Sequence, residues 1–161
     1  MSPLWWPTGW LYLRRYDGVE HLMTSRERKT LQPWVKWALH DPRTGWVCWK
    51  VEDAYLPGLP DFIVKSPKGT ASLLEIKWAT TMGVVPFDLS REQLARLREW
   101  GAGAHVLVAV PLVGQCYVVP IEALRAPLES LLPGDAARLP GCSTCAFDRR
   151  KLMTTLRAHL M

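Results

Sequence analysis

The sequence predicts one α/β domain in which a helix, three strands, a second helix and two more strands follow one another, with helices added at the C-terminal end. Three runs of β-branched and aromatic residues, separated by Pro and Gly clusters, predict adjacent strands. A segment with helical spacing of apolar residues stands on either side of these runs, which indicates a mixed sheet flanked by helices. The length of 161 residues is typical of a single domain, so we expect residues 1–161 to share one core.

The first helix is predicted over residues 24–41, "TSRERKTLQPWVKWALHD". Its apolar stripe consists of Leu31, Trp34, Val35 and Ala38. One turn earlier the same stripe reaches Glu27, which places a carboxylate on the inward face. Pro33 lacks an N–H and kinks a helix interior, so we expect a bend or a separate first turn.

The three strands are predicted at 45–53, 60–66 and 71–79, and a meander is their simplest arrangement. Side chains alternate along a strand, so one face of the third strand carries Leu74, Ile76 and Trp78. These apolar side chains can fill a core. Glu75 and Lys77 lie on the opposite face.

The second helix begins after Ser90, in "LSREQLARLREW", because Gln93 stands three positions on as the partner in a capping box. The apolar run at 104–112 is typical of a strand buried on both faces, and 115–120 is its expected neighbour. The remainder is predicted as two helices joined by a Pro- and Gly-rich loop, at 121–132 and 147–160.

Composition and charge exclude a membrane span and indicate an intracellular protein. Twenty Lys and Arg against fifteen Asp and Glu give a net charge of +5, a mild bias toward polyanions such as nucleic acid. No long apolar stretch resembles a transmembrane helix. The first residues lack the basic-then-apolar order of a secretory signal, so we expect a cytoplasmic location.

The four cysteines form an incomplete metal-binding pattern. Cys142 and Cys145 have the C-x-x-C spacing of a zinc half-site, but a second compact pair is missing. Cys48 and Cys116 lie in predicted strands, where a free cysteine usually serves as a small buried apolar residue. A structural metal is therefore disfavoured, and whether the C-x-x-C pair binds anything stays open.

Two predicted strands bring acidic residues together. Asp61 opens the second strand, and if this strand pairs with the third, its carboxylate comes close to Glu75. Adjacent carboxylates repel unless a cation lies between them. Mg²⁺ suits such a pair because it prefers oxygen ligands and takes one or two carboxylates together with phosphate oxygens. Lys77 would orient a water or offset phosphate charge, and Glu27 would supply a third carboxylate.

Glu27, then "PD" ending at Asp61, then "EIK" from Glu75 to Lys77 resemble the PD-(D/E)xK nuclease superfamily, which has a restriction-endonuclease-like αβββαβ core. The resemblance implies that Asp61 and Glu75 are ligands of Mg²⁺, for which Mn²⁺ substitutes. It also implies that the backbone carbonyl of Ile76 is a further ligand, that Lys77 is the catalytic lysine, and that Glu27 is the helical acid.

Within the superfamily, "SRERKTLQPWVKWAL" and "GAGAHVLVAVP" are similar to archaeal and phage Holliday junction resolvases, and less so to the VRR-NUC group. The resemblance covers 24–120 and leaves out the Trp-rich extension 1–22 and the segment 121–161. It implies a homodimeric Mg²⁺-dependent endonuclease for four-way junctions or other branched DNA, and it is compatible with a phage-encoded protein acting inside its host cell. A flap or single-strand nuclease and a non-catalytic DNA-binding module are the alternatives.

The site residues also have plainer interpretations. Asp61 is a common turn residue, and Glu75 with Lys77 could form a solvated surface pair. Glu27 could complement the helix dipole, and Gln93 with Ser90 could serve the capping box alone rather than the site. The candidate DNA contacts are Arg14, Arg15, Arg26, Arg28 and Lys29, which could equally form a solvated basic face. The tryptophans of the N-terminal extension could stack on bases or pack against the domain.

Overall fold

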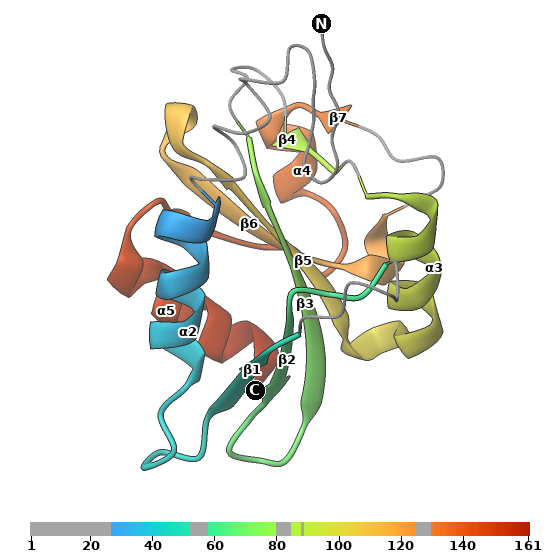
Figure 1. Ribbon diagram of the computed structural model, residues 1–161. Coiled ribbons are helices and arrows are strands. Elements are labelled where there is room, and N and C mark those ends of the chain that lie inside the picture. The colour runs from blue at the N-terminus through green and yellow to red at the C-terminus, as the bar shows by residue number, and fades with distance from the viewer. Residues whose placement is uncertain (1–26, 52–57, 80–84, 88, 125–129) are drawn as a thin grey trace, which may run out of the picture.

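The computed structural model describes residues 27–51, 58–79, 85–87, 89–124 and 130–161, and it confirms the predicted fold class (Figure 1). Six strands form a mixed sheet in the order β1-β2-β3-β5-β6-β8. They are β1 (Val47–Lys50), β2 (Phe62–Lys65), β3 (Ala71–Trp78), β5 (Ala104–Val110), β6 (Gln115–Pro120) and β8 (Ser143–Ala146). The β3 and β5 strands are parallel, and the other neighbours are antiparallel.

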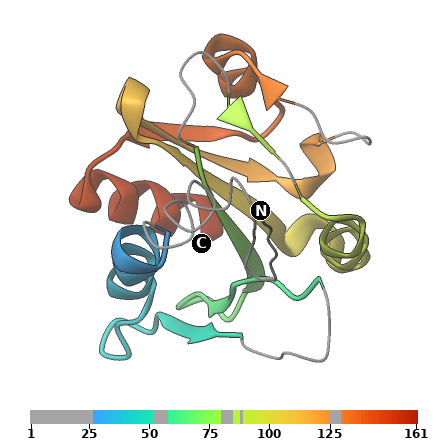
Figure 2. The ribbon, with the colours of Figure 1, turned by 45° about the horizontal axis from the view of Figure 1, so that its top comes forward.

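Helices cover both faces of the sheet (Figure 2). Helices α2 (Gln32–Leu39) and α5 (Arg149–Leu160) pack on one face, and α3 (Arg91–Trp100) packs on the other. Because β3 and β5 run parallel, the chain must cross over between them, and α3 lies in that crossover. The predicted alternation along β3 is confirmed, since Ile76 and its apolar neighbours at i±2 belong to the core beneath α2 and α5.

The smaller elements lie at the ends of the strands. They are the π-helical turn η1 (Glu27–Leu31), the strands β4 (Val85–Pro86) and β7 (Ser130–Leu131), the helix α4 (Pro133–Ala137), and the 3-10 turns η2 (Gly101–Gly103), η3 (Pro111–Val113) and η4 (Ile121–Ala123). The β4 and β7 strands pair with each other in a separate two-stranded sheet.

The first helix is divided as Pro33 predicted. The turn η1 precedes α2, and Pro33 lies in the first turn of α2, where its missing N–H has no intrahelical partner to lose. The predicted start at 24–26 lies outside the described residues. The second helix begins as predicted, because Ser90 Oγ accepts from Gln93 N at 3.0 Å and Gln93 Oε1 accepts from Ser90 N at 2.9 Å.

The prediction of a helix over 121–132 is wrong. The segment starts with the single 3-10 turn η4, and Ser130 and Leu131 form β7. Pro127 stands in the middle of the predicted helix and is incompatible with a continuous one. The next helix, α4, begins at Pro133, where a proline in the first turn is favourable.

The "GCSTC" segment, predicted as part of a loop, contains the edge strand β8. Its residues are small and weakly apolar, so they carry little of the alternation that predicts a strand. The segment is a strand because its backbone pairs with β6, and the local sequence does not indicate this pairing. The helix predicted over 147–160 is confirmed as α5, which Asp148 caps by accepting from Arg150 N and Lys151 N at 3.0 Å.

None of the helices in the described part of the chain combines the length and apolar composition needed to cross a membrane. The Trp-rich extension 1–22 lies outside the described residues, together with the interpretations placed on it.

A histidine pair ties α5 to the sheet. His105 Nδ1 of β5 lies 3.0 Å from His159 Nε2 of α5, and His159 Nδ1 lies 2.7 Å from Ser143 Oγ of β8. Burial, followed by the neighbouring His159, lowers the pKa of His105 from 6.5 to about 4. Burial also lowers the pKa of His159, so the fold favours the neutral form of both rings.

We expect the free energy of unfolding to fall as the pH is lowered from 7.5 to 5. In the unfolded chain His105 binds a proton below its ordinary pKa of 6.5, whereas in the folded protein it stays neutral until about pH 4. Between these values the unfolded state binds more protons, which costs on the order of 2 kcal/mol at pH 5. Urea unfolding at both pH values measures the loss. The free energy of unfolding of His105→Gln should fall by less than that of the wild type, and the difference should be about this amount. An equal fall in the variant would contradict the assignment of the pH dependence to His105.

Candidate active site

Asp61 joins the second and third strands at the point where their backbone pairing stops. The β2–β3 ladder ends with Phe62 opposite Leu74. Beyond it, Asp61 Oδ2 accepts a hydrogen bond of 2.9 Å from the backbone N–H of Ile76. The carboxylate thus takes the place of a backbone carbonyl and is held beside the residue that follows Glu75. This contact reaches across the sheet, so Asp61 does more than close a turn.

The carbonyl of Ile76 faces the same gap. In an antiparallel ladder the N–H and C=O of one residue point toward the same neighbouring strand. Since the N–H of Ile76 points to Asp61, its carbonyl oxygen also lies on the β2 side of β3, beyond the last ladder pair. A backbone oxygen and a carboxylate are therefore presented together.

Glu75 is a buried carboxylate, with 3% of the residue exposed. Its Oε2 accepts a hydrogen bond of 2.8 Å from Gln93 Nε2 and lies 3.5 Å from Lys77 Nζ. Burying a charge is costly unless it is paired and hydrogen-bonded, and both partners are present here. The interpretation of Glu75 and Lys77 as a solvated surface pair does not fit this burial.

Gln93 serves the helix and the site at once. Its Oε1 accepts from Ser90 N in the capping box and lies 3.5 Å from Lys77 Nζ, while its Nε2 donates to Glu75. The two interpretations of Gln93 in the sequence are therefore not exclusive. The N-terminus of α3 fixes the position of the amide that holds the Glu75 carboxylate.

Lys50 was missed by the sequence predictions. It ends β1 opposite Phe62, and its Nζ lies 3.6 Å from Asp61 Oδ1. Each of the two carboxylates, Asp61 and Glu75, is thus accompanied by one lysine ammonium group. The sequence does place Lys50 in the first predicted strand of the meander. Its contact with Asp61, however, follows only from the register of β1 against β2.

The structure describes only some of the other predicted site residues. Glu27 lies in η1, which packs against β3, but the structure does not describe its side chain or that of Arg28. Lys29 is exposed on η1. Arg14, Arg15 and Arg26 lie outside the described residues.

A largely apolar hollow of about 290 Å³ opens at Pro60, the residue before Asp61. It is lined by Val51, Leu59, Pro60, Ile63, Leu73, Arg96, Glu99 and Trp100. Trp100 is 48% exposed, and its indole lies on the backbone of Gly103, where an added Cβ would be 2.5 Å from Nε1. The hollow therefore combines a half-exposed aromatic ring with polar groups of both charges.

The donor chemistry of these residues suits a hard divalent cation. Asp61, Glu75 and the Ile76 carbonyl together offer two carboxylates and a backbone oxygen, and Mg²⁺ is commonly bound by one or two carboxylates while it keeps several waters. Within the described residues, no group of three or more His, Cys, Asp and Glu side chains is arranged to hold a metal ion. Glu27, whose side chain is not described, remains the candidate for a third carboxylate.

No family model and no curated protein matches the chain. Among solved structures, the chain is similar to that of Hjc, a Holliday junction resolvase from the archaeal hyperthermophile Archaeoglobus fulgidus. The identity is 23%, the match covers 69% of this chain and 88% of the other, and the TM-score is 0.46. An activity cannot be transferred at this similarity, so a function of this chain must follow from its own site.

Proposed function

We propose that this protein is a Mg²⁺-dependent endonuclease that hydrolyses phosphodiester bonds in DNA. The observation that carries the proposal is the joint placement of Asp61 and Glu75 at the end of the β2–β3 ladder, with Lys77 Nζ 3.5 Å from Glu75 Oε2. This set of groups matches the PD-(D/E)xK pattern of the sequence. A module that only binds DNA has no use for two carboxylates facing phosphate.

Asp61, Glu75 and the Ile76 carbonyl would hold the cation, for which Mn²⁺ would substitute, with Glu27 as the further acid. When bound, the cation polarises the phosphoryl oxygen and lowers the pKa of a bound water. Lys77, whose Nζ is held by Glu75 and Gln93, would donate to the attacking water or to a phosphate oxygen. Lys50 would add a second positive charge on the Asp61 side.

Preorganisation favours hydrolysis over simple binding. The Asp61 carboxylate is fixed by a backbone N–H, and the Glu75 carboxylate is fixed by a side chain from a capped helix. Groups that are already oriented need no rearrangement when charge develops on the phosphate. The net charge of +5 and the exposed Lys29 favour association with the DNA backbone, which makes binding salt-dependent.

The hollow at Pro60 favours a substrate with unstacked bases near the scissile bond. Its volume of about 290 Å³ is small for a ligand site and suits one flat ring system. A base would stack on Trp100, while Arg96 and Glu99 would form hydrogen bonds to the polar edge of the base. Bases beside a branch point are easier to unstack than bases inside a duplex. The resemblance of the sequence to Holliday junction resolvases then leads us to favour a resolvase. Paired cuts across a junction require two-fold symmetry, so the active form would be a homodimer. A flap or single-strand nuclease is the second candidate.

Cleavage of a set of DNA substrates tests the proposal. Four-way junction, flap, single-stranded and linear duplex DNA are incubated with and without Mg²⁺, and products are resolved by electrophoresis. We expect cation-dependent cutting that Asp61→Asn, Glu75→Gln and Lys77→Met each reduce about a hundredfold or more, because each removes charge stabilisation at the phosphate. Asp135→Asn, which removes an exposed carboxylate on α4, is the matched control and should cut normally.

The products also decide the substrate. Symmetric nicks restricted to the junction support a resolvase, and cutting restricted to flaps or single strands supports the second candidate. Equal cutting of linear duplex DNA would show that the nuclease does not select its substrate by structure. Binding without cutting in Mg²⁺ or Mn²⁺ would overturn the nuclease itself.

Trp100→Ala tests the base-stacking role of the hollow. We expect it to raise KM about tenfold, because loss of one stacked base costs ~1–3 kcal/mol. The effect should vanish on a substrate with an abasic nucleotide at the branch point. Trp37→Ala, which removes a similarly exposed tryptophan from α2, is the control. If Trp100→Ala weakens intact and abasic substrates equally while cutting persists, the nuclease stands and the stacking role is wrong.

A further inference from the structure

Two cysteines face each other across the edge of the sheet. Cys116 of β6 is directly opposite Cys145 of β8 in the antiparallel register. Directly opposed residues have Cα atoms about 4.5–5.5 Å apart and share one face of the sheet. This separation lies within the range of about 4.4–6.8 Å that a disulfide spans. Both cysteines are free thiols in the structure.

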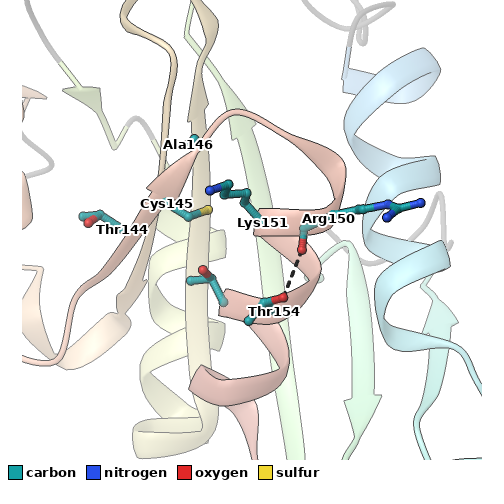
Figure 3. A pocket seen from close by; sticks show the side chains of 7 residues that line it. Thr144, Cys145, Ala146, Arg150, Lys151 and Thr154 are labelled. Atoms are coloured by element: carbon teal, nitrogen blue, oxygen red, sulfur yellow. Dashed lines mark hydrogen bonds between the residues drawn. The ribbon is translucent and has the colours of Figure 1, made fainter.

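The two thiols have unequal access to solvent. Cys116 is fully buried in the core beneath α2 and α5. Cys145 is half-buried and lines a pocket of about 520 Å³ on the same face (Figure 3). The other lining residues are Thr144, Ala146, Arg150, Lys151, Thr154 and Thr155. In Figure 3, Lys151 lies on the Cys145 side of the pocket, whereas Arg150 extends toward α2. A small reagent can therefore enter beside Cys145 and cannot reach Cys116 directly.

The pair is also unequal in acidity. The interaction with Cys116 is the largest influence on Cys145 and lowers the pKa of its thiol, against burial and the charge of Asp148. The same interaction and burial raise the pKa of Cys116. The lowered pKa favours the thiolate of Cys145, and the thiolate is the reactive form of cysteine. Burial raises the pKa of the nearby Cys142 thiol to about 11, so that residue is a natural comparison.

We propose that Cys145 and Cys116 form a peroxide-reactive thiol pair in which Cys145 is the site of attack and Cys116 resolves it to a cross-strand disulfide. The Cys145 thiolate attacks one oxygen of a hydroperoxide, the O–O bond breaks, and the leaving alkoxide or hydroxide takes up a proton. Cys145 becomes a sulfenic acid. The sulfur of Cys116 then attacks the Cys145 sulfur, the S–O bond breaks, and the oxygen leaves as water with the Cys116 proton. Two electrons pass from the thiols to the peroxide.

The disulfide would attach the edge strand β8 covalently to β6. A lowered pKa, partial exposure and an adjacent resolving thiol are the features of peroxide-sensitive cysteines. The pocket lies on the α5 face of the sheet, opposite the face that carries Glu75 and α3, so the proposal does not depend on nuclease activity. Thiol reductants would reverse the bond by exchange.

The full-length reduced protein is treated with a small excess of hydrogen peroxide at pH 7. The peroxide is removed, and the thiols are counted with a chromogenic disulfide after the protein is unfolded in guanidinium chloride. Four thiols should fall to two, with a mass loss of two hydrogen atoms, and peptide mapping should identify a Cys116–Cys145 link. Cys142→Ser should behave as the wild type. Cys116→Ser should stop at a sulfenic acid on Cys145, which dimedone traps, and Cys145→Ser should keep its remaining thiols.

A second measurement needs no variant. Limiting iodoacetamide at pH 7 should label Cys145 of the wild-type protein before Cys48, Cys116 and Cys142. A disulfide that involves Cys142, equal oxidation of all four cysteines, or retention of four thiols at peroxide levels that oxidise free cysteine would each overturn the proposal, as would preferential alkylation of another cysteine.

Discussion

The burial of the Glu75 carboxylate is the constraint on which the site depends. A charge with 3% exposure requires partners, and they come from two elements. Lys77 is two residues along the same strand, and Gln93 is in the first turn of α3, where it also completes the capping box. The position at which α3 begins is thereby coupled to the geometry of the site. A shift of the helix start by one residue would remove both the cap and the Glu75 hydrogen bond.

The alternation of side chains along β3 divides the molecule into two functional halves. Ile76 and the apolar residues beside it build the core beneath α2 and α5, while Glu75 and Lys77 face α3 and form the candidate active site. The thiol pair and the histidine pair both lie on the α5 side, between the sheet and that helix. The backbone of Ile76 connects the halves, because its side chain fills one core while its N–H anchors Asp61.

Local patterns predicted the features that depend on nearby residues. The capping box of Ser90, the break at Pro33 and the opposite faces of Glu75 and Ile76 all follow from spacing within a few positions. Lys50 was missed because its contact with Asp61 depends on the register of two strands. The strand β8 was missed because its small residues pair at an edge, and the helix predicted over 121–132 failed because apolar spacing was weighed without Pro127. The contact between Cys116 and Cys145 also depends on the register of two strands, so their spacing in the sequence gave no sign that they face each other.

Cation binding in the absence of DNA tests the central claim most directly, because it probes the carboxylates without assuming a substrate. Mn²⁺ is titrated into the protein while the free ion is followed by electron paramagnetic resonance. The account predicts a saturable site in the wild type and in Asp135→Asn, and its loss in both Asp61→Asn and Glu75→Gln. Wild-type protein that binds no Mn²⁺, or an unchanged affinity in both site variants, would contradict it.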